Sequence, residues 1–327
     1  MKLCLVKVKE FQKTLKKSFE LTSLTPYSEN KTRMICSPAS PNSGITFIVG
    51  GQKIPAKVNF LADSNFHSTF LKKRKTQIFP VEHLLAAFVG LEVDNAIIKI
   101  REGNEIPDSD LNPYRFVKKI LETWVQIQKT PKKVIKILKP FKIKSPKDDS
   151  LAYFLPSENY EVTAIISFLN LIGKQVYETI IFPKQFVKEL SWARSFIRSP
   201  LDEKGEKWQR ICKLLKILPK NPQNSPIITF DERKFLNSLR CADEPVRHKI
   251  LDFIGDFSLL VYSLRGKVIL YKPSHQFNHF LIKKYSLSCK GIILFWPSTQ
   301  QPEGLLEHLQ VASLDSSCPS EFTSPLG

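Results

Sequence analysis

Residues 243–260, DEPVRHKILDFIGDFSLL, constrain what this chain can fold into more than any other segment. If they form an α-helix, the apolar residues at 250, 251, 253, 254, 257, 259 and 260 occupy most of its circumference. A helix that is apolar on nearly all sides is buried in a core rather than laid on a surface. The sequence therefore predicts a long, buried helix over residues 243–260.

Three polar residues interrupt this predicted helix at a spacing of four: His248, Asp252 and Asp256. That spacing places them on one stripe. Buried charges are costly unless a partner or a metal ion compensates them, and zinc accepts both imidazole nitrogen and carboxylate oxygen. The alternative is an ordinary salt bridge between His248 and Asp252 on a solvated face. Predicted burial favours a metal site.

The dipeptide Glu82-His83 supplies the groups that such a site lacks. It opens VEHLLAAFVGL, a predicted helix with Pro80 just ahead of its first turn and Gly90 near its end. A catalytic zinc site needs three protein ligands and an open position, so we expect His83 to be the third ligand. Glu82 then provides a base beside the metal, as hydrolytic sites require. Asp256 is expected to orient a histidine.

His275 and His279, in PSHQFNHF, are two further histidines of interest. A histidine beside a metal could protonate a leaving amine or stabilise an oxyanion. The alternative is a capping or core histidine. Lys249 and Lys272 flank the histidine clusters, and either could receive a phosphate, although chance placement is the better explanation in a chain this basic.

The pattern of elements predicts an α+β fold. Apolar alternation predicts short strands over 3–9, 45–49, 54–60, 95–100, 152–155, 162–168 and 175–181. Helical patterns predict helices over 81–91, 114–126, 184–196 and 243–260. A segment rich in Lys and Pro, residues 130–149, marks a boundary near residue 130. We therefore expect related domains over 1–130 and 131–299, followed by a disordered tail over 300–327.

Composition limits the class of protein and its partners. The chain has 327 residues and a net charge of +18, from 49 Lys and Arg against 31 Asp and Glu. This excess favours a phosphorylated substrate or contact with an anionic inner membrane surface, although solvated surface lysines are the simpler explanation. No nucleic-acid-binding signature occurs, so no nucleic-acid partner is expected. Six cysteines without a CxxC pair, and a charged N-terminal segment, favour a soluble cytoplasmic protein.

Five segments together resemble the UDP-3-O-acyl-N-acetylglucosamine deacetylase family, the zinc amidases that commit a precursor to lipid A. The segments are VEHLLAAFVGLEVDNAIIKI (81–100), EIP (105–107), WARSF (192–196), DEPVRHKILDFIGDF (243–257) and SHQFNH (274–279). They occur in the order and spacing of the family. The resemblance implies two related α+β domains, each a mainly antiparallel sheet packed on two helices, in a layered sandwich with the site between the domains.

The resemblance also implies a role for each matching residue. It makes His83, His248 and Asp252 the ligands of one catalytic Zn²⁺. It makes Glu82 the general base and His275 the residue that assists the tetrahedral intermediate and leaving amine, with Asp256 as its charge partner. It makes Ser195 a catalytic residue whose hydroxyl lies near the substrate carbonyl. Substrate contacts are implied for Phe196, Phe168, Lys249 and Lys272. The implied protein is a cytoplasmic, monomeric hydrolase that acts on the 2-acetamido group of a UDP-linked acylated amino sugar.

Two other interpretations remain open at this stage. The chain reads SLTPYSEN over 23–30 and PDSDLNP over 107–113, where the family has glycine-containing turns. These differences suggest a zinc hydrolase of another acylated sugar nucleotide. The second alternative is a non-catalytic sugar-nucleotide or lipid-binding relative. The presence of Glu82 counts against it, because a binding protein has little use for a base.

Overall fold

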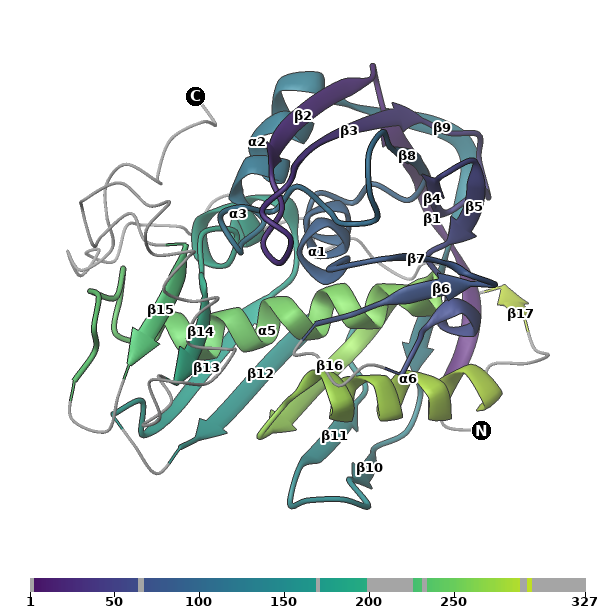
Figure 1. Cartoon of the computed structure of the whole chain (residues 1–327). Coiled ribbons are helices and arrows are strands. Elements are labelled where there is room, and N and C mark those ends of the chain that lie inside the picture. The colour runs from purple at the N-terminus through teal and green to yellow at the C-terminus, as the bar shows by residue number, and fades with distance from the viewer. Residues whose placement is uncertain are drawn as a thin grey trace, which may run out of the picture.

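The chain folds into two larger sheets with helices between them. The structure is a computed structural model, and it describes residues 3–63, 68–168, 171–198, 226–230, 234–288 and 293–295. Figure 1 shows one sheet above, the other below, and helices α1 (Glu82–Gly90) and α5 (Glu244–Phe257) between them. The mixed α+β class predicted from the sequence is confirmed. The predicted tail over 300–327 lies outside the described residues.

The upper sheet has five strands, and its inner face is apolar. In spatial order these are β2 (Phe19–Leu24), β3 (Lys31–Pro38), β8 (Ala96–Ile100), β4 (Ile45–Val49) and β5 (Gln52–Pro55). Neighbours pair antiparallel except β4 and β8, which are parallel. Along β8 buried and exposed residues alternate, because successive side chains of a strand point to opposite faces. The buried face of this sheet therefore belongs to the core, and the other face is solvated.

The lower sheet has eight strands among the described residues. Its main path runs β10 (Phe141–Lys144), β11 (Leu151–Leu155), β16 (Ser263–Tyr271), β9 (Val125–Ile137), β1 (Leu3–Leu15) and β17 (Ile293–Phe295). Two more strands branch from β16, namely β12 (Tyr160–Ser167) and then β13 (Lys174–Ile180). β9 runs continuously through residue 130 and pairs with β1. The domain boundary at that point stays a prediction.

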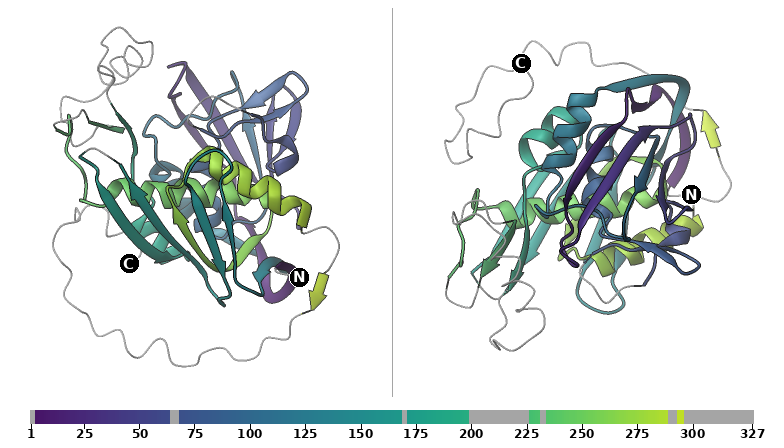
Figure 2. Two further views of the ribbon diagram at one scale, coloured as in Figure 1. Left: turned by 90° about the horizontal axis from the view of Figure 1, so that it is seen from below. Right: turned by 45° about the horizontal axis from the view of Figure 1, so that its top comes forward.

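Short elements and the remaining helices complete the fold. Two small strand pairs are β6 (Leu71–Lys73) with β7 (Thr76–Ile78), and β14 (Ser195–Arg198) with β15 (Ile227–Phe230). The other helices are α2 (Tyr114–Thr123), α3 (Pro183–Glu189) and α6 (His275–Ser288), with 3₁₀ turns η1 (Val58–Phe60) and η3 (Ser258–Leu260). Figure 2 shows these elements from two further sides. Each helix in the described part of the chain is too short or too polar to span a bilayer.

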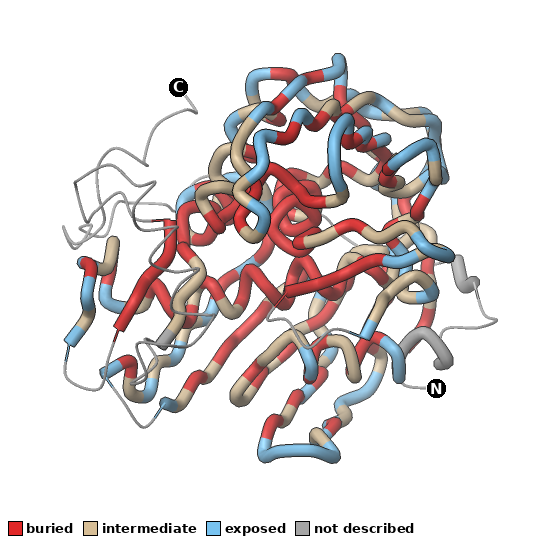
Figure 3. Tube along the Cα trace, viewed as in Figure 1, coloured by how far each residue is buried: buried red, intermediate tan, exposed pale blue. Residues whose placement is uncertain are grey.

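The core lies where α5 meets its neighbours. α5 packs against α1 on one side and against β12 and β13 on another, so it is enclosed as its sequence predicts. Only Arg247 and Lys249 among its residues are not buried. Figure 3 shows the same concentration of buried residues along α1 and α5. Burying each large apolar side chain contributes about 1.5–3 kcal/mol, and this packing fixes the position of every polar group on the two helices.

Three predicted elements differ from the structure. The strand predicted over 54–60 ends at Pro55, after which i→i+3 hydrogen bonds close η1. The helix predicted over 114–126 ends at Thr123, because Trp124 has φ 68° and the chain then enters β9. The helix predicted over 184–196 ends at Glu189. Ser195 instead begins β14, a strand paired with a segment more than 25 residues further along the chain, which local periodicity does not reveal.

Candidate active site

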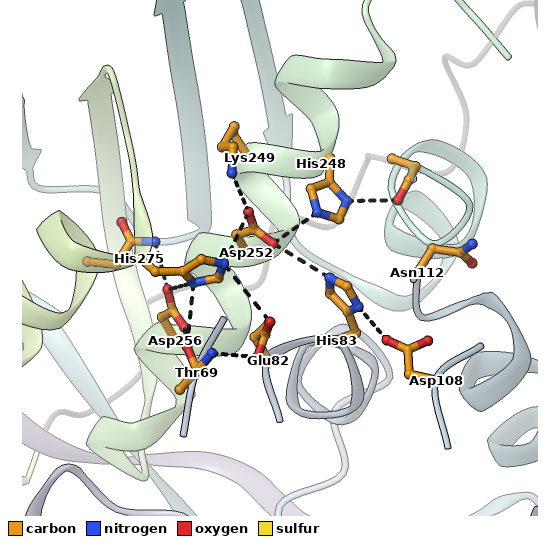
Figure 4. Close-up of polar contacts among 12 residues, drawn as sticks. Thr69, Glu82, His83, Asp108, Asn112, His248, Lys249, Asp252, Asp256 and His275 are labelled. Carbon is orange, nitrogen blue, oxygen red and sulfur yellow. Dashed lines mark hydrogen bonds and ion pairs between the residues drawn. The ribbon is translucent and has the colours of Figure 1, made fainter. Parts of the chain in front are cut away.

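Two helices bring three candidate metal ligands together. His83 lies in the first turn of α1, and His248 and Asp252 lie one turn apart on α5 (Figure 4). The Nε2 atom of His248 is 3.2 Å from Asp252 Oδ1, and the Nε2 atom of His83 is 3.7 Å from the same oxygen. All three side chains are buried. The residues expected to be ligands thus converge on one small space.

Each imidazole is oriented by a contact at its other nitrogen. His83 Nδ1 lies 2.5 Å from Asp108 Oδ2, and His248 Nδ1 donates to the Ala193 carbonyl at 3.0 Å. With both Nδ1 atoms engaged, both Nε2 atoms face the shared space. Metal-binding histidines are held in this way, because the outer hydrogen bond fixes the tautomer and the plane of the ring.

The electrostatics of the two rings differ because their outer partners differ. Burial opposes a charged His83 ring, but the Asp108 and Asp252 carboxylates reverse this and raise its pKa well above the ordinary value. Burial dominates at His248, whose outer partner is a neutral carbonyl, and lowers its pKa. A cation in the shared space competes with a proton at His83, while His248 already favours the neutral form that binds metals.

Asp252 has one oxygen that the described protein atoms leave without a hydrogen bond. Asp252 Oδ2 accepts from Lys249 Nζ at 2.8 Å, whereas the buried Oδ1 has no hydrogen-bond partner. Burying a carboxylate oxygen unpaired is costly, so an orphaned oxygen beside two Nε2 atoms indicates a cation site. Two imidazole nitrogens and one carboxylate oxygen are a donor set that zinc accepts with one position left open. The residues present fit a zinc ion.

Glu82 faces the same space from the start of α1. The residue is 2% exposed, and burial raises its pKa. The backbone N–H of Thr69 donates to Glu82 Oε2 at 2.9 Å, which leaves Oε1 directed toward His275 at 4.0 Å from Nε2. A buried carboxylate with raised proton affinity, fixed beside a metal-type donor set, is suited to accept a proton from water.

His275 approaches from the first turn of α6 and is held by Asp256. His275 Nδ1 donates to Asp256 Oδ2 at 2.9 Å, and its Nε2 lies 3.6 Å from Asp252 Oδ2. Burial opposes a charged ring, but the Asp256 and Asp252 carboxylates outweigh it and raise the pKa of His275 to about 9. At neutral pH His275 is therefore an imidazolium with its Nε2 proton facing the site.

The residues predicted to contact substrate lie at different distances from this centre. The Phe196 ring lies 6.3 Å from the His248 ring, and Lys249 Nζ lies 5.0 Å from the centre of the Phe196 ring. Phe168 packs edge-on against Phe196 at 5.7 Å. Lys272 is partly exposed, and its amine contacts Asp149 at 2.7 Å rather than a member of the buried cluster.

Ser195 lies at the start of β14, two residues after the carbonyl that holds His248. Its backbone N–H donates to the Leu111 carbonyl at 3.1 Å. The preceding residue, Arg194, is fully buried and ion-paired with Glu244 at the start of α5. This pair ties the WARSF segment to the helix that carries His248 and Asp252.

Sequence reasoning missed two residues that organise the site. Asp108 belongs to PDSDLNP, a turn whose two aspartates carry no periodic signal to show which one faces inward. Thr69 precedes β6 in a segment without helical or strand alternation, yet it contacts both Glu82 and Asp256. Only the folded chain brings these loop residues to the two helices.

The fold and the site together define a class. A buried donor set of two imidazoles and a carboxylate, faced by a second carboxylate and an imidazolium, has the composition of a metal-dependent hydrolase site. Comparison with known families is more specific. A profile described as UDP-3-O-acyl N-acetylglycosamine deacetylase matches residues 12–286, and the chain belongs to this family.

Individual relatives match over most of their length. A UDP-3-O-acyl-N-acetylglucosamine deacetylase from Methylococcus capsulatus is 33% identical over 285 residues, which cover 83% of this chain and 88% of the relative. The protein of that name from Saccharophagus degradans is 34% identical over 277 residues, covering 82% and 88%. The one from Histophilus somni is 30% identical over 313 residues, covering 92% and 98%.

Proposed function

We propose that this chain is a zinc-dependent deacetylase that hydrolyses the 2-acetamido group of UDP-3-O-acyl-N-acetylglucosamine. The products are acetate and a free amine on the sugar. The observation that carries the proposal is the orphaned Oδ1 of Asp252, which lies beside the Nε2 atoms of His83 and His248. Family membership supplies the substrate class, because the relatives carry the name of this reaction.

His83, His248 and Asp252 are the groups that would hold the ion. When bound, zinc supplies a Lewis acid that polarises the amide carbonyl and makes water a better nucleophile. The protein keeps the two rings in place through Asp108 and the Ala193 carbonyl. These outer contacts support a site that is formed before substrate arrives.

Glu82 acts as the general base. Burial raises its pKa, so its carboxylate has a stronger hold on a proton than an ordinary glutamate. The Thr69 N–H fixes one carboxylate oxygen, and the other accepts the proton as the oxygen of water bonds to the amide carbon. The base is therefore held in place before the proton transfer takes place.

His275 acts as the general acid. Its pKa of about 9 keeps the ring protonated at neutral pH, and Asp256 holds the Nδ1 side so that Nε2 faces the site. As the carbon–nitrogen bond breaks, His275 gives its Nε2 proton to the departing amine. A base with raised pKa and an acid with raised pKa, 4.0 Å apart, can serve the two proton transfers of amide hydrolysis.

Substrate contacts extend the proposal outward from this centre. Ser195 is assigned a hydroxyl contact near the substrate carbonyl, and Phe196 and Phe168 are assigned packing against the sugar nucleotide. Lys249 and Lys272 are assigned to the diphosphate, which suits the net charge of +18. The contact of Lys272 with Asp149 is exposed, so binding a phosphate there requires only that a surface pair be exchanged.

Turnover with a defined metal content tests the proposal. The purified chain is stripped with a chelator, assayed for acetate release from UDP-3-O-acyl-N-acetylglucosamine, and assayed again after one equivalent of zinc is added. Activity restored by zinc supports the proposal. If the protein binds one zinc ion but hydrolyses only another acylated sugar nucleotide, the proposed substrate is wrong. If it binds the nucleotide without zinc and without turnover, the proposal is overturned.

A further inference from the structure

His279 is a histidine that the proposed reaction does not use, although it lies next to its acid. It follows His275 by one turn of α6, and its side chain is mostly buried, with 13% exposed. Its Nε2 atom lies 2.9 Å from Thr69 Oγ1. The distance from the same atom to Asp256 Oδ1 is 3.6 Å, too long for a hydrogen bond, so His279 reaches Asp256 through the threonine.

The hydroxyl of Thr69 has one proton and can donate to only one of the acceptors near it. Its shortest contact is to Asp256 Oδ1, and a carboxylate can only accept, so the hydroxyl donates there. Its lone pairs are then free to accept, and His279 Nε2–H is the donor at hydrogen-bond distance. His275 Nδ1 lies farther away, at 3.4 Å, and has its own bond to Asp256.

Asp256 is in this way held at both of its oxygens. Oδ1 accepts from Thr69, and Oδ2 accepts from His275 and from Asn278 Nδ2, the latter at 2.9 Å. A carboxylate with three donors has a fixed plane. Thr69 is also the residue whose backbone N–H fixes Glu82, so one residue connects the base to the partner of the acid.

We infer that His279 is a positioning residue for the reaction: its Nε2–H donates to Thr69, holds the threonine proton on Asp256, and so fixes the carboxylate that orients His275. The inference rests on the proposed deacetylase function. It assigns to His279 no contact with substrate or metal. Loss of this donor leaves Thr69 free to rotate and leaves His275 with a less ordered partner.

Kinetics of matched variants test the inference. His279→Leu removes the donor, whereas His279→Gln places an amide N–H near the position of Nε2. We expect His279→Leu to lower kcat by about tenfold with little change in KM, and His279→Gln to recover most of it. The double variant His279→Leu/Thr69→Val should be no slower than Thr69→Val alone, because both substitutions break the same chain of hydrogen bonds from His279 through Thr69 to Asp256. Lys283→Gln, one turn further along α6, is the matched control.

A spectroscopic measurement separates this inference from the proposed function. NMR of protein with ¹⁵N-labelled histidine should show that the ring of His279 carries a proton on Nε2. His279→Leu and Thr69→Val should both shift the His275 Nδ1–H resonance. Lys283→Gln should leave that resonance unchanged. An unchanged His275 resonance, or equal kcat for the Leu and Gln variants in folded protein, would overturn the role of His279. Absence of wild-type turnover with the resonance shifts present would overturn only the proposed function.

Discussion

The backbone of α5 at Gly255 touches the backbone of α1 at Glu82. A β-carbon at Gly255 would lie 2.1 Å from the Glu82 carbonyl oxygen, a distance that no real contact reaches. The absence of a side chain at Gly255 therefore sets how closely the two helices cross. Because α1 carries His83 and Glu82 and α5 carries the other two candidate ligands, this crossing also sets the size of the site.

Replacing Gly255 tests that relationship. Gly255→Ala must push the helices apart, at a cost of about 1–3 kcal/mol in the free energy of unfolding. The shift moves His83 away from His248, and a displacement of about 1 Å can lower kcat by about 100-fold. Denaturant unfolding and zinc-saturated turnover measure the two effects.

Gly90→Ala is the matched control at the far end of α1. A β-carbon there would meet the side chain of Phe186 rather than backbone, so the variant loses stability but keeps Glu82 in place. Equal kcat in the folded Gly255 and Gly90 variants would show that the helix crossing does not position the site.

Asp108 should determine how tightly the site holds its metal. Asp108→Ala removes the carboxylate that fixes His83, and loss of such an outer partner typically weakens metal affinity by 10–100-fold, that is, roughly one to two decades. Competition with a chelator measures the affinity. Asp110→Ala, two residues along the same turn and partly exposed, should leave it unchanged. Similar losses in both variants would point to a disturbed turn rather than to the His83 contact.

Activity should depend on pH in two limbs. The reaction needs Glu82 deprotonated and His275 protonated, so activity rises with pH through the raised pKa of Glu82 and falls again near pH 9 as His275 loses its proton. Asp256 raises the pKa of His275, so Asp256→Asn should lower that pKa and move the alkaline limb to lower pH.

The pH dependence of kcat/KM, measured for wild type and for Asp256→Asn, checks this. Glu158→Gln serves as the control, because Glu158 is 82% exposed and pairs with a lysine of β9 outside the buried cluster. If the alkaline limb of the kcat/KM profile lies at the same pH in Asp256→Asn as in wild type, His275 is not the general acid.

The buried pair of Arg194 and Glu244 should be the most costly to break among the ion pairs of the described residues. Both side chains have 0% exposure, and Glu244 also accepts the backbone N–H groups of Arg194 and Arg240. Glu244→Ala leaves a buried guanidinium without its carboxylate, which costs about 3–5 kcal/mol in the free energy of unfolding. Glu10→Ala breaks an exposed pair with Arg265 and should leave the urea midpoint unchanged. Equal midpoints in the two variants would contradict this.

The sequence predicted the groups that lie on regular elements better than those in loops. The four-residue spacing of His248 and Asp252 is a property of one helix, and its apolar surroundings correctly predicted burial. His83 came from the same kind of local pattern. Asp108 and Thr69 contact the site only because distant segments meet, and no periodicity marks them.

Arg194 shows the same limit in the fold. The segment before it reads as a continuing helix, but a partner 50 residues away, Glu244, binds both its side chain and its backbone N–H just ahead of β14. Tertiary contacts of this kind outweigh local propensity, and they cannot be read from one segment alone.

Acetate release by zinc-loaded Glu82→Gln tests the central claim most directly. The substitution keeps the shape of the side chain and its contact with Thr69 but removes the base, so zinc should still bind with one ion per chain while kcat falls by at least about 100-fold. Turnover of UDP-3-O-acyl-N-acetylglucosamine at the wild-type rate by a fully zinc-loaded Glu82→Gln protein would contradict the account.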